Sequence, residues 1–152
     1  MEVKTILDLI EWSRSLHVQL AQCLSHCAKI HPNERAVMLL EYLASAETEM
    51  ANMVADFEHQ ADPNVASTYV YDHMPHEPVK THLECDDHYA QLDADAISGE
   101  VFDFHEQIID LYRTLLGKAE LPEVEELMQM LLDMELNETK LLVHQVRRMD
   151  DL

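Results

Sequence analysis

Two glutamates occupy places in the sequence that apolar residues would normally fill. Glu47 lies in the apolar stripe of residues 34–60, and Glu135 lies at the matching place in the segment that starts at residue 122. Because both stripes recur at helical spacing, the two carboxylates are predicted to face the interior of a helical protein. A buried carboxylate needs a cation beside it, which a metal ion or a basic side chain supplies.

Two other groups of residues have the donor types of a metal site. Cys23, Cys27 and His31 lie four residues apart on one face of a predicted helix, which suits a soft metal ion. Small cysteines in an apolar core stripe are the preferred interpretation. Five histidines near the middle of the chain fit no zinc signature, so a solvated loop is preferred there over a lid, a docking surface or a weak metal site. They are His59, His73, His76, His82 and His88.

Four long helices are predicted to position these residues. Apolar residues recur at helical spacing over residues 3–29, 34–60, 98–117 and 122–149. They form two hairpins, and the connection over residues 61–95 is long enough to travel the length of a bundle, so the second and third helices should run parallel. The expected fold class is all-α, a single ferritin-like four-helix-bundle domain over residues 1–152 with an irregular crossover.

The composition argues against several classes of function. The chain has 152 residues, with 10 Lys and Arg against 30 Asp and Glu, for a formal net charge of -20. Such a charge opposes binding to nucleic acid and to anionic membrane surfaces. No apolar run is long enough to span a membrane. Three cysteines and an N-terminus without a basic segment followed by an apolar run predict a cytoplasmic protein.

The second predicted hairpin repeats the first. A shift of 92 residues aligns the first helix with the third, and a shift of 88 residues aligns the second helix with the fourth, placing Glu47 on Glu135. The four-residue difference is assigned to the turn between the first two helices. Under this alignment His17 falls on Ile109, so His17 is expected to face inward and to be hydrogen-bonded rather than to bind a metal.

Part of the second hairpin resembles rubrerythrin and other ferritin-like proteins. The stretch from His105 to Tyr112 resembles their third bundle helix, in which a Glu six residues before a Tyr points inward, and Pro122–Leu127 with Met134–Glu138 resembles their fourth. The resemblance implies a bundle that holds two iron or manganese ions. Each hairpin of such a bundle gives one Glu from its first helix and a Glu-x-x-His pair from its second. The family also leads us to expect a homodimer, as do the apolar residues Tyr69, Val70 and Tyr71.

Carried over residue by residue, the resemblance implies a degenerate site with four glutamate ligands for iron or manganese. They are Glu47, Glu106, Glu135 and Glu138. Three further residues line the site: Arg14, where the family has Glu, Met50, where it has His, and His17. With Glu106 inward, His105 should point elsewhere, since adjacent helical residues diverge by about 100°.

The sequence leaves two alternatives open. Arg14 is a permanent cation that would neutralise the carboxylates as a metal ion would. The chain would then hold no metal and would be a non-enzymatic interaction module, binding a protein through its crossover or its acidic face. In a second register, Glu49–Asn52 resembles a bacterioferritin second-helix motif with Asn in place of His.

Overall fold

The computed structural model describes residues 3–68 and 86–151, and its long elements are all helices. They are α1 (Ile6–Ile30), α2 (Glu34–Gln60), α4 (Ala94–Lys118) and α5 (Pro122–Asp150). Two short helical turns, α3 (Pro63–Ala66) and η2 (His88–Gln91), belong to the segment that connects α2 to α4. The predicted all-α class is confirmed. Tyr69, Val70 and Tyr71, the apolar residues that contributed to the expectation of a homodimer, lie outside the described residues.

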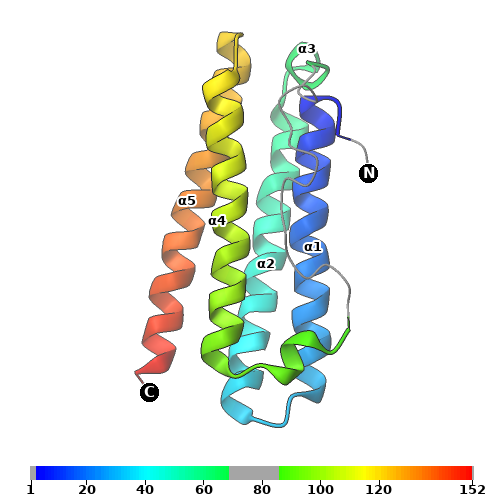
Figure 1. Ribbon diagram of the computed structural model, residues 1–152. Helices are drawn as coiled ribbons and strands as arrows, with labels where there is room; N and C mark the ends of the chain where they lie inside the picture. The colour runs from blue at the N-terminus through cyan, green and yellow to red at the C-terminus, as the bar shows by residue number, and fades with distance from the viewer. Residues whose placement is uncertain (1–2, 69–85, 152) are drawn as a thin grey trace.

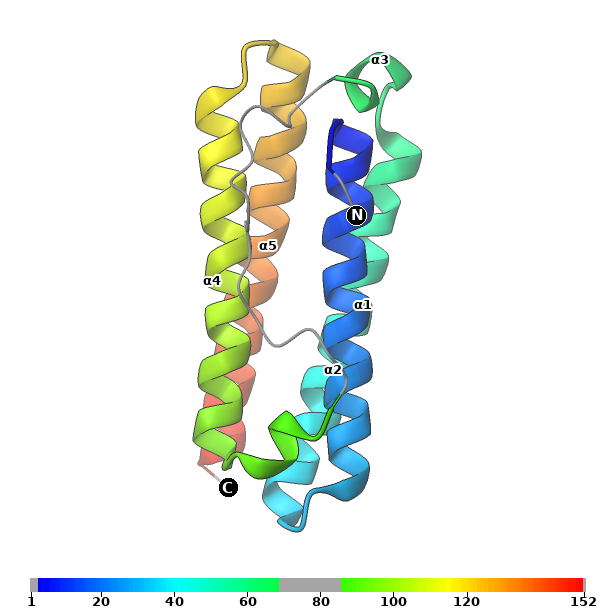
Figure 2. The same ribbon diagram turned by 45° about the vertical axis from the view of Figure 1, so that its right-hand side comes forward.

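The four long helices lie side by side (Figure 1). Helix α1 is antiparallel to α2, and α4 is antiparallel to α5, so the chain forms two hairpins that face each other (Figure 2). Helices α2 and α4 run in the same direction, as expected from the length of the connection between them. Among the described residues, no helix has an apolar stretch long enough to cross a bilayer.

Polar side chains determine where three of the long helices begin. Thr5 accepts a hydrogen bond from the backbone N–H of Asp8, and the Asp8 carboxylate accepts from the Thr5 N–H, which completes a capping box. Asn33 caps α2, and Asp93 caps α4 by accepting from Ala96 N at 2.8 Å. The expected start of the third long helix near residue 98 is therefore wrong by one turn.

A single shift of 88 residues relates the two hairpins. It places α1 on α4 end to end, the Thr5 cap on the Asp93 cap, and the first residue of α2 on the first residue of α5. Every buried residue of α4 then corresponds to a buried residue of α1. The predicted shift of 92 residues for the first pair is wrong by four residues. Four residues are close to one helical turn, so the error keeps most apolar positions on the same face.

The two matching caps give a first prediction. Thr5→Ala and Asp93→Ala should each lower the free energy of unfolding by about 1 kcal/mol, because each leaves backbone N–H groups of a first turn without their acceptor. Leu121 precedes α5 and makes no side-chain cap, so Leu121→Ser should have the opposite effect. Urea denaturation of the three variants measures these changes. Equal stability of the parent and both alanine variants would contradict the role of the caps.

Candidate functional site

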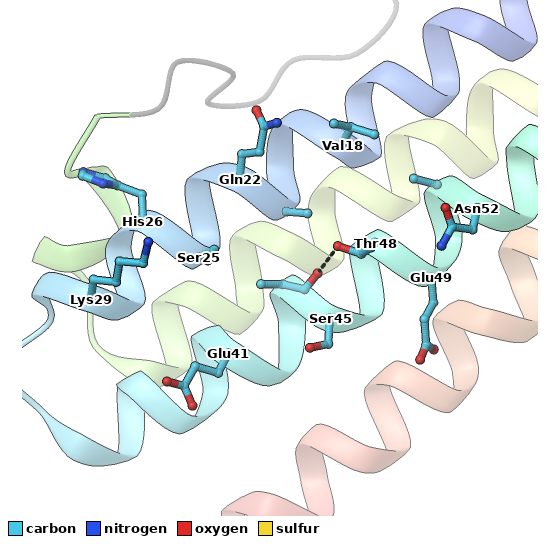
Figure 3. Close-up of a pocket in the computed structure, with 13 residues that line it drawn as sticks. Val18, Gln22, Ser25, His26, Lys29, Glu41, Ser45, Thr48, Glu49 and Asn52 are labelled. Atoms are coloured by element: carbon cyan, nitrogen blue, oxygen red, sulfur yellow. Dashed lines mark hydrogen bonds between the residues drawn. The ribbon is translucent and has the colours of Figure 1, made fainter.

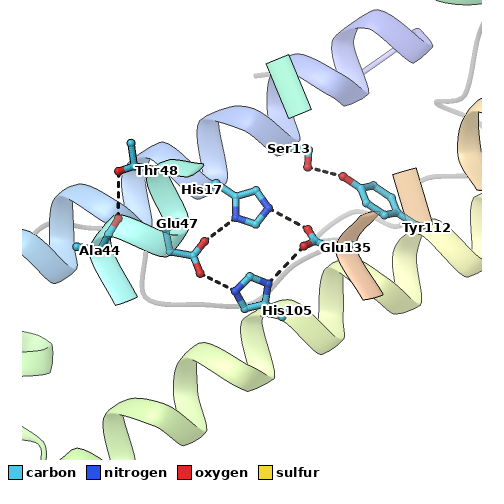
Figure 4. Close-up of polar contacts among 8 residues, drawn as sticks. All are labelled: Ser13, His17, Ala44, Glu47, Thr48, His105, Tyr112 and Glu135. Atoms are coloured by element: carbon cyan, nitrogen blue, oxygen red, sulfur yellow. Dashed lines mark hydrogen bonds and ion pairs between the residues drawn. The ribbon is translucent and has the colours of Figure 1, made fainter. Parts of the chain in front are cut away.

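Four fully buried side chains, one from each long helix, meet near the middle of the bundle (Figure 4). They are His17 of α1, Glu47 of α2, His105 of α4 and Glu135 of α5. His17 Nδ1 lies 2.6 Å from Glu47 Oε2, and its Nε2 lies 2.9 Å from Glu135 Oε1. His105 Nε2 lies 2.5 Å from Glu47 Oε1, and its Nδ1 lies 3.5 Å from Glu135 Oε2. Imidazoles and carboxylates thus alternate in a closed arrangement, here called the His–Glu ring.

The 88-residue repeat maps the His–Glu ring onto itself, with His17 on His105 and Glu47 on Glu135. Each hairpin gives a histidine from its first helix and a glutamate from its second. Phe104 packs edge-on against both imidazoles, with ring centroids 5.5 Å from His17 and 5.4 Å from His105. The apolar stripes that pair the helices therefore also bring the four polar side chains together.

Opposite charges determine the protonation of the ring. Burial by itself would lower the pKa of His17, but Glu135 and Glu47 raise it to about 9. Against the same effect of burial, Glu47 and Glu135 raise the pKa of His105 to about 10. Burial would raise the pKa of Glu47, yet His105 and His17 lower it to about 2. The pKa of Glu135 is likewise lowered despite burial, first by the charge of His17.

With these pKa values, the ring holds two imidazolium ions and two carboxylates at neutral pH, so its net charge is zero. This matters because an unbalanced charge in a dry core is costly.

One corner of the ring is looser than the others. His105 Nδ1 and Glu135 Oε2 are both buried, and neither has a hydrogen-bond partner among residues 3–68 and 86–151. Their separation of 3.5 Å is within ion-pair range, but the geometry is not that of a hydrogen bond. The other three corners, at 2.5 to 2.9 Å, are hydrogen bonds of charged groups.

A second buried polar pair lies beside the ring. Tyr112 on α4 and Ser13 on α1 share a hydrogen bond of 2.5 Å between their hydroxyl oxygens. Burial raises the pKa of Tyr112 well above its usual range, and the nearby charge of Glu135 adds to the increase. The repeat places Leu24 and Val101 at the corresponding positions, so this pair exists on one side of the ring only.

The structure brings together some of the residues predicted for the site and separates others. Glu47 and Glu135 meet, as expected, and His17 faces inward with hydrogen bonds, as expected. The inward placement of Glu106 is wrong, because its side chain is exposed. The placement of Arg14 beside the carboxylates is also wrong, because Arg14 is exposed and lies 3.9 Å from Glu58.

The two remaining predicted positions lie one turn after the ring glutamates. Met50 is buried on α2, three residues after Glu47. Glu138 is half-buried on α5, three residues after Glu135. Its charge contributes to the raised pKa of Tyr42, which is due first to burial and then to Glu49 and Glu138.

Sequence reasoning missed His105. The four-residue slip in the alignment of the first and third helices moved His17 onto Ile109 and left His105 facing outward. The signal that would have found it is the coincidence of both polar pairs under one shift, which places His17 on His105 and Glu47 on Glu135.

The other predicted metal sites are not supported within the described residues. Cys27 is a free cysteine buried in the core, as preferred above, whereas Cys23 is buried and disulfide-bonded. Both nitrogens of His31 have partners, since Nε2 donates to Leu92 O at 2.8 Å and Nδ1 accepts from Asn33 N at 3.0 Å. Of the middle histidines, His88 contacts Glu100 at 2.7 Å, whereas His73, His76 and His82 lie outside the described residues.

A surface groove of about 880 Å³ runs along the outer side of the α1–α2 hairpin (Figure 3). It is lined by Val18 and Thr48, the residues that follow His17 and Glu47, and Thr48 Oγ1 donates to Ala44 O at 3.0 Å within it. Adjacent residues of a helix point about 100° apart. The groove is therefore lined by other faces of these helices than those that form the His–Glu ring.

No protein-family model, no curated protein and no solved structure gives a significant match to this chain. The geometry and the charges of the His–Glu ring are therefore the features from which a function can be inferred.

The pKa values predict how the stability of the metal-free protein depends on pH. The histidines, whose pKa values rise from 6.5 to about 9 and about 10 on folding, stabilise the fold fully below pH 6.5, and this contribution is lost as the pH rises toward 9 and 10. Glu47, whose pKa falls from 4.5 to about 2, contributes above pH 4.5 and loses its contribution as the pH falls toward 2. The free energy of unfolding, from urea denaturation, should be greatest between about pH 5 and 6.5 and decrease toward pH 9. A constant value from pH 6.5 to 9 would contradict the assigned charges.

Substitutions in the ring should separate charge balance from packing. His105→Leu alone leaves two carboxylates facing one imidazolium, and should cost about 3–5 kcal/mol of unfolding free energy. Replacing His17, Glu47, His105 and Glu135 together by Leu removes every charge, and should give a protein about as stable as the parent or more stable, without the loss of stability above pH 6.5. Arg14→Ala, at the surface, should change stability by less than about 1 kcal/mol. A single variant as stable as the parent would show that the ring contributes no charge balance.

Proposed function

We propose that the chain is a metal-binding helical-bundle protein whose His–Glu ring takes one divalent transition-metal ion. The observation that carries the proposal is the convergence of His17, His105 and Glu135, which offer ligand atoms that all lie within 4.8 Å of one another in the buried centre of the bundle. A mixed set of imidazole and carboxylate ligands suits iron, manganese or zinc.

The loose corner of the ring fits such an ion. Ligand atoms at about 2.1 Å from a four-coordinate metal lie about 3.4 Å from one another. His105 Nδ1 and Glu135 Oε2 already lie 3.5 Å apart, and both are buried without a hydrogen-bond partner. His17 Nε2 and Glu135 Oε1, at 2.9 Å, need to separate by only about 0.5 Å.

Charge balance also favours the binding of a divalent ion in exchange for two protons. A metal ion binds neutral imidazoles, so each histidine of the ring must release one proton. Two protons leave and one divalent cation enters, and the net charge of the ring stays at zero. The buried centre therefore accepts a divalent ion without creating an uncompensated charge.

The proposal includes a distant relationship to ferritin-like proteins. Two antiparallel hairpins, the common direction of α2 and α4, and an inward glutamate on the second helix of each hairpin support it. In the present chain the inward polar residues of the first helices are His17 and His105, whereas the resemblance expects glutamate at the positions of Arg14 and Glu106. Two buried carboxylates replace four, which favours one metal ion over the expected pair.

A second candidate function follows from the completeness of the ring without metal. Three of its four corners are hydrogen bonds, and its charges balance as they stand. The ring would then be a structural ion-pair network that sets which helices pack together, in a non-enzymatic protein that acts through its surface. This is the interaction module anticipated from the sequence, with His17 and His105 in the place of Arg14.

Metal binding distinguishes the two functions. The protein is stripped with a chelator and dialysed against Zn²⁺, Mn²⁺ or, without oxygen, Fe²⁺, and bound metal is measured by elemental analysis. We expect one equivalent per chain for the parent and none for the variant that combines His17→Leu with His105→Leu. His26→Leu is the matched control, because His26 is an exposed histidine of the same helix α1, paired with Asp87. Below pH 9 the affinity should rise by roughly 100-fold per pH unit, since two protons are released. No bound metal in the parent would leave the structural network as the function.

A further inference from the structure

The two carboxylates of the His–Glu ring differ in their contacts, and we infer from this that they have different roles. Glu135 binds the metal ion together with His17 and His105, whereas Glu47 holds both imidazoles in position. The metal ion then has three protein ligands and keeps a coordination position for a small exchangeable ligand, such as a small anion or a diatomic molecule. This inference rests on the proposed function.

Glu47 is already fully engaged by the two imidazoles. Its Oε2 accepts from His17 Nδ1 at 2.6 Å, and its Oε1 accepts from His105 Nε2 at 2.5 Å. Ligand atoms at about 2.1 Å from one ion lie about 3.4 Å from one another, so the two Glu47 contacts would have to lengthen by about 0.8 to 0.9 Å to admit an ion, more than either contact of Glu135. A carboxylate that accepts from the far nitrogen of a metal-binding histidine fixes the orientation of its ring. Glu47 performs this role for both histidines.

On the side of the ring at Glu135, in contrast, ligand atoms are available to a metal ion. With His17 Nδ1 and His105 Nε2 directed at Glu47, the nitrogens left for a metal are His17 Nε2 and His105 Nδ1, and both face Glu135. These are the residues whose ligand atoms lie within 4.8 Å of one another. Glu135 Oε2 has no hydrogen-bond partner, so one of its oxygens is available to the ion.

Three protein ligands leave a transition-metal ion with at least one position open. Two imidazoles and one carboxylate around an ion with open positions are the ligand set of metal sites that bind small exogenous molecules. Thr139 Oγ1 is also buried without a hydrogen-bond partner among the described residues, and Thr139 follows Glu135 by four residues on the same face of α5. We assign this hydroxyl as a hydrogen-bond donor to the exchangeable ligand. Complete burial of the ring limits that ligand to a few atoms.

Two isosteric variants test the assignment, with Co²⁺ as the probe because its visible spectrum reports its coordination. Glu47→Gln should still bind one Co²⁺ per chain with the parent's spectrum, and with roughly 10- to 100-fold lower affinity. Glu135→Gln should lose binding by a much larger factor. Sodium azide should shift the visible spectrum of the parent and of Glu47→Gln. Equal loss of Co²⁺ by the two variants, or a spectrum that azide does not change, would overturn the inference. A parent that binds no Co²⁺ would instead overturn the proposed function on which the inference rests.

A measurement on the unmodified protein covers the case in which Glu135→Gln does not fold. Imidazole ¹⁵N spectra of the Zn²⁺-loaded protein identify which nitrogen of each histidine keeps its hydrogen. Retention at His17 Nδ1 and His105 Nε2 would support the assignment, because Glu47 accepts from these two nitrogens. Retention at the other nitrogen of either ring would place the metal on the side of Glu47 and would overturn it.

Discussion

The charge inside the bundle must sum to zero, and the packing of the four long helices depends on meeting that condition. Each helix brings one ionisable side chain to a centre from which water is excluded, and no three of the four would balance. A carboxylate of α2 and a carboxylate of α5 are each shared between the imidazoles of α1 and α4. The ring therefore specifies which helices meet and at what height, while the apolar stripes above and below it supply most of the favourable free energy of burial.

The repeat explains why each of the four helices brings a polar residue to the centre. The positions that depart from the repeat lie around Glu135, whose contacts differ from those of Glu47. An 88-residue shift relates His17 to His105 and Glu47 to Glu135. Three positions near the ring depart from that symmetry: Tyr112 corresponds to Leu24, Thr139 to Ala51 and Glu138 to Met50. In each of these pairs the polar residue is the one on the second hairpin. Glu135, the carboxylate with the longer contacts, is thus on the hairpin that carries these additional polar residues.

Much of the fold could be predicted from the sequence, because apolar periodicity reports helices directly. The second and fourth long helices began at residues 34 and 122, as expected, and Glu47 and Glu135 were found because a charge within an apolar stripe stands out. Periodicity could not fix the alignment of the first and third helices, since a slip of four residues moves a stripe by nearly one turn and leaves most of it on the same face. That ambiguity placed Glu106 and Arg14 inside and His105 outside. The contacts between helices, which place a histidine of each hairpin between two carboxylates, resolve it, and in the sequence the one signal of the correct alignment is that a single 88-residue shift pairs both histidines and both glutamates.

We propose that the ring is a balanced set of two cations and two anions, in which a divalent ion can take the place of two protons. Imidazole ¹⁵N spectra of the metal-free protein at pH 7.5 test it most directly, because each ring nitrogen reports whether it carries a hydrogen. If the account is right, both nitrogens of His17 and both nitrogens of His105 carry hydrogen at this pH, which lies below their pKa values of about 9 and about 10. A neutral imidazole at either position would contradict it, because the buried carboxylates would then lack the charge that balances them.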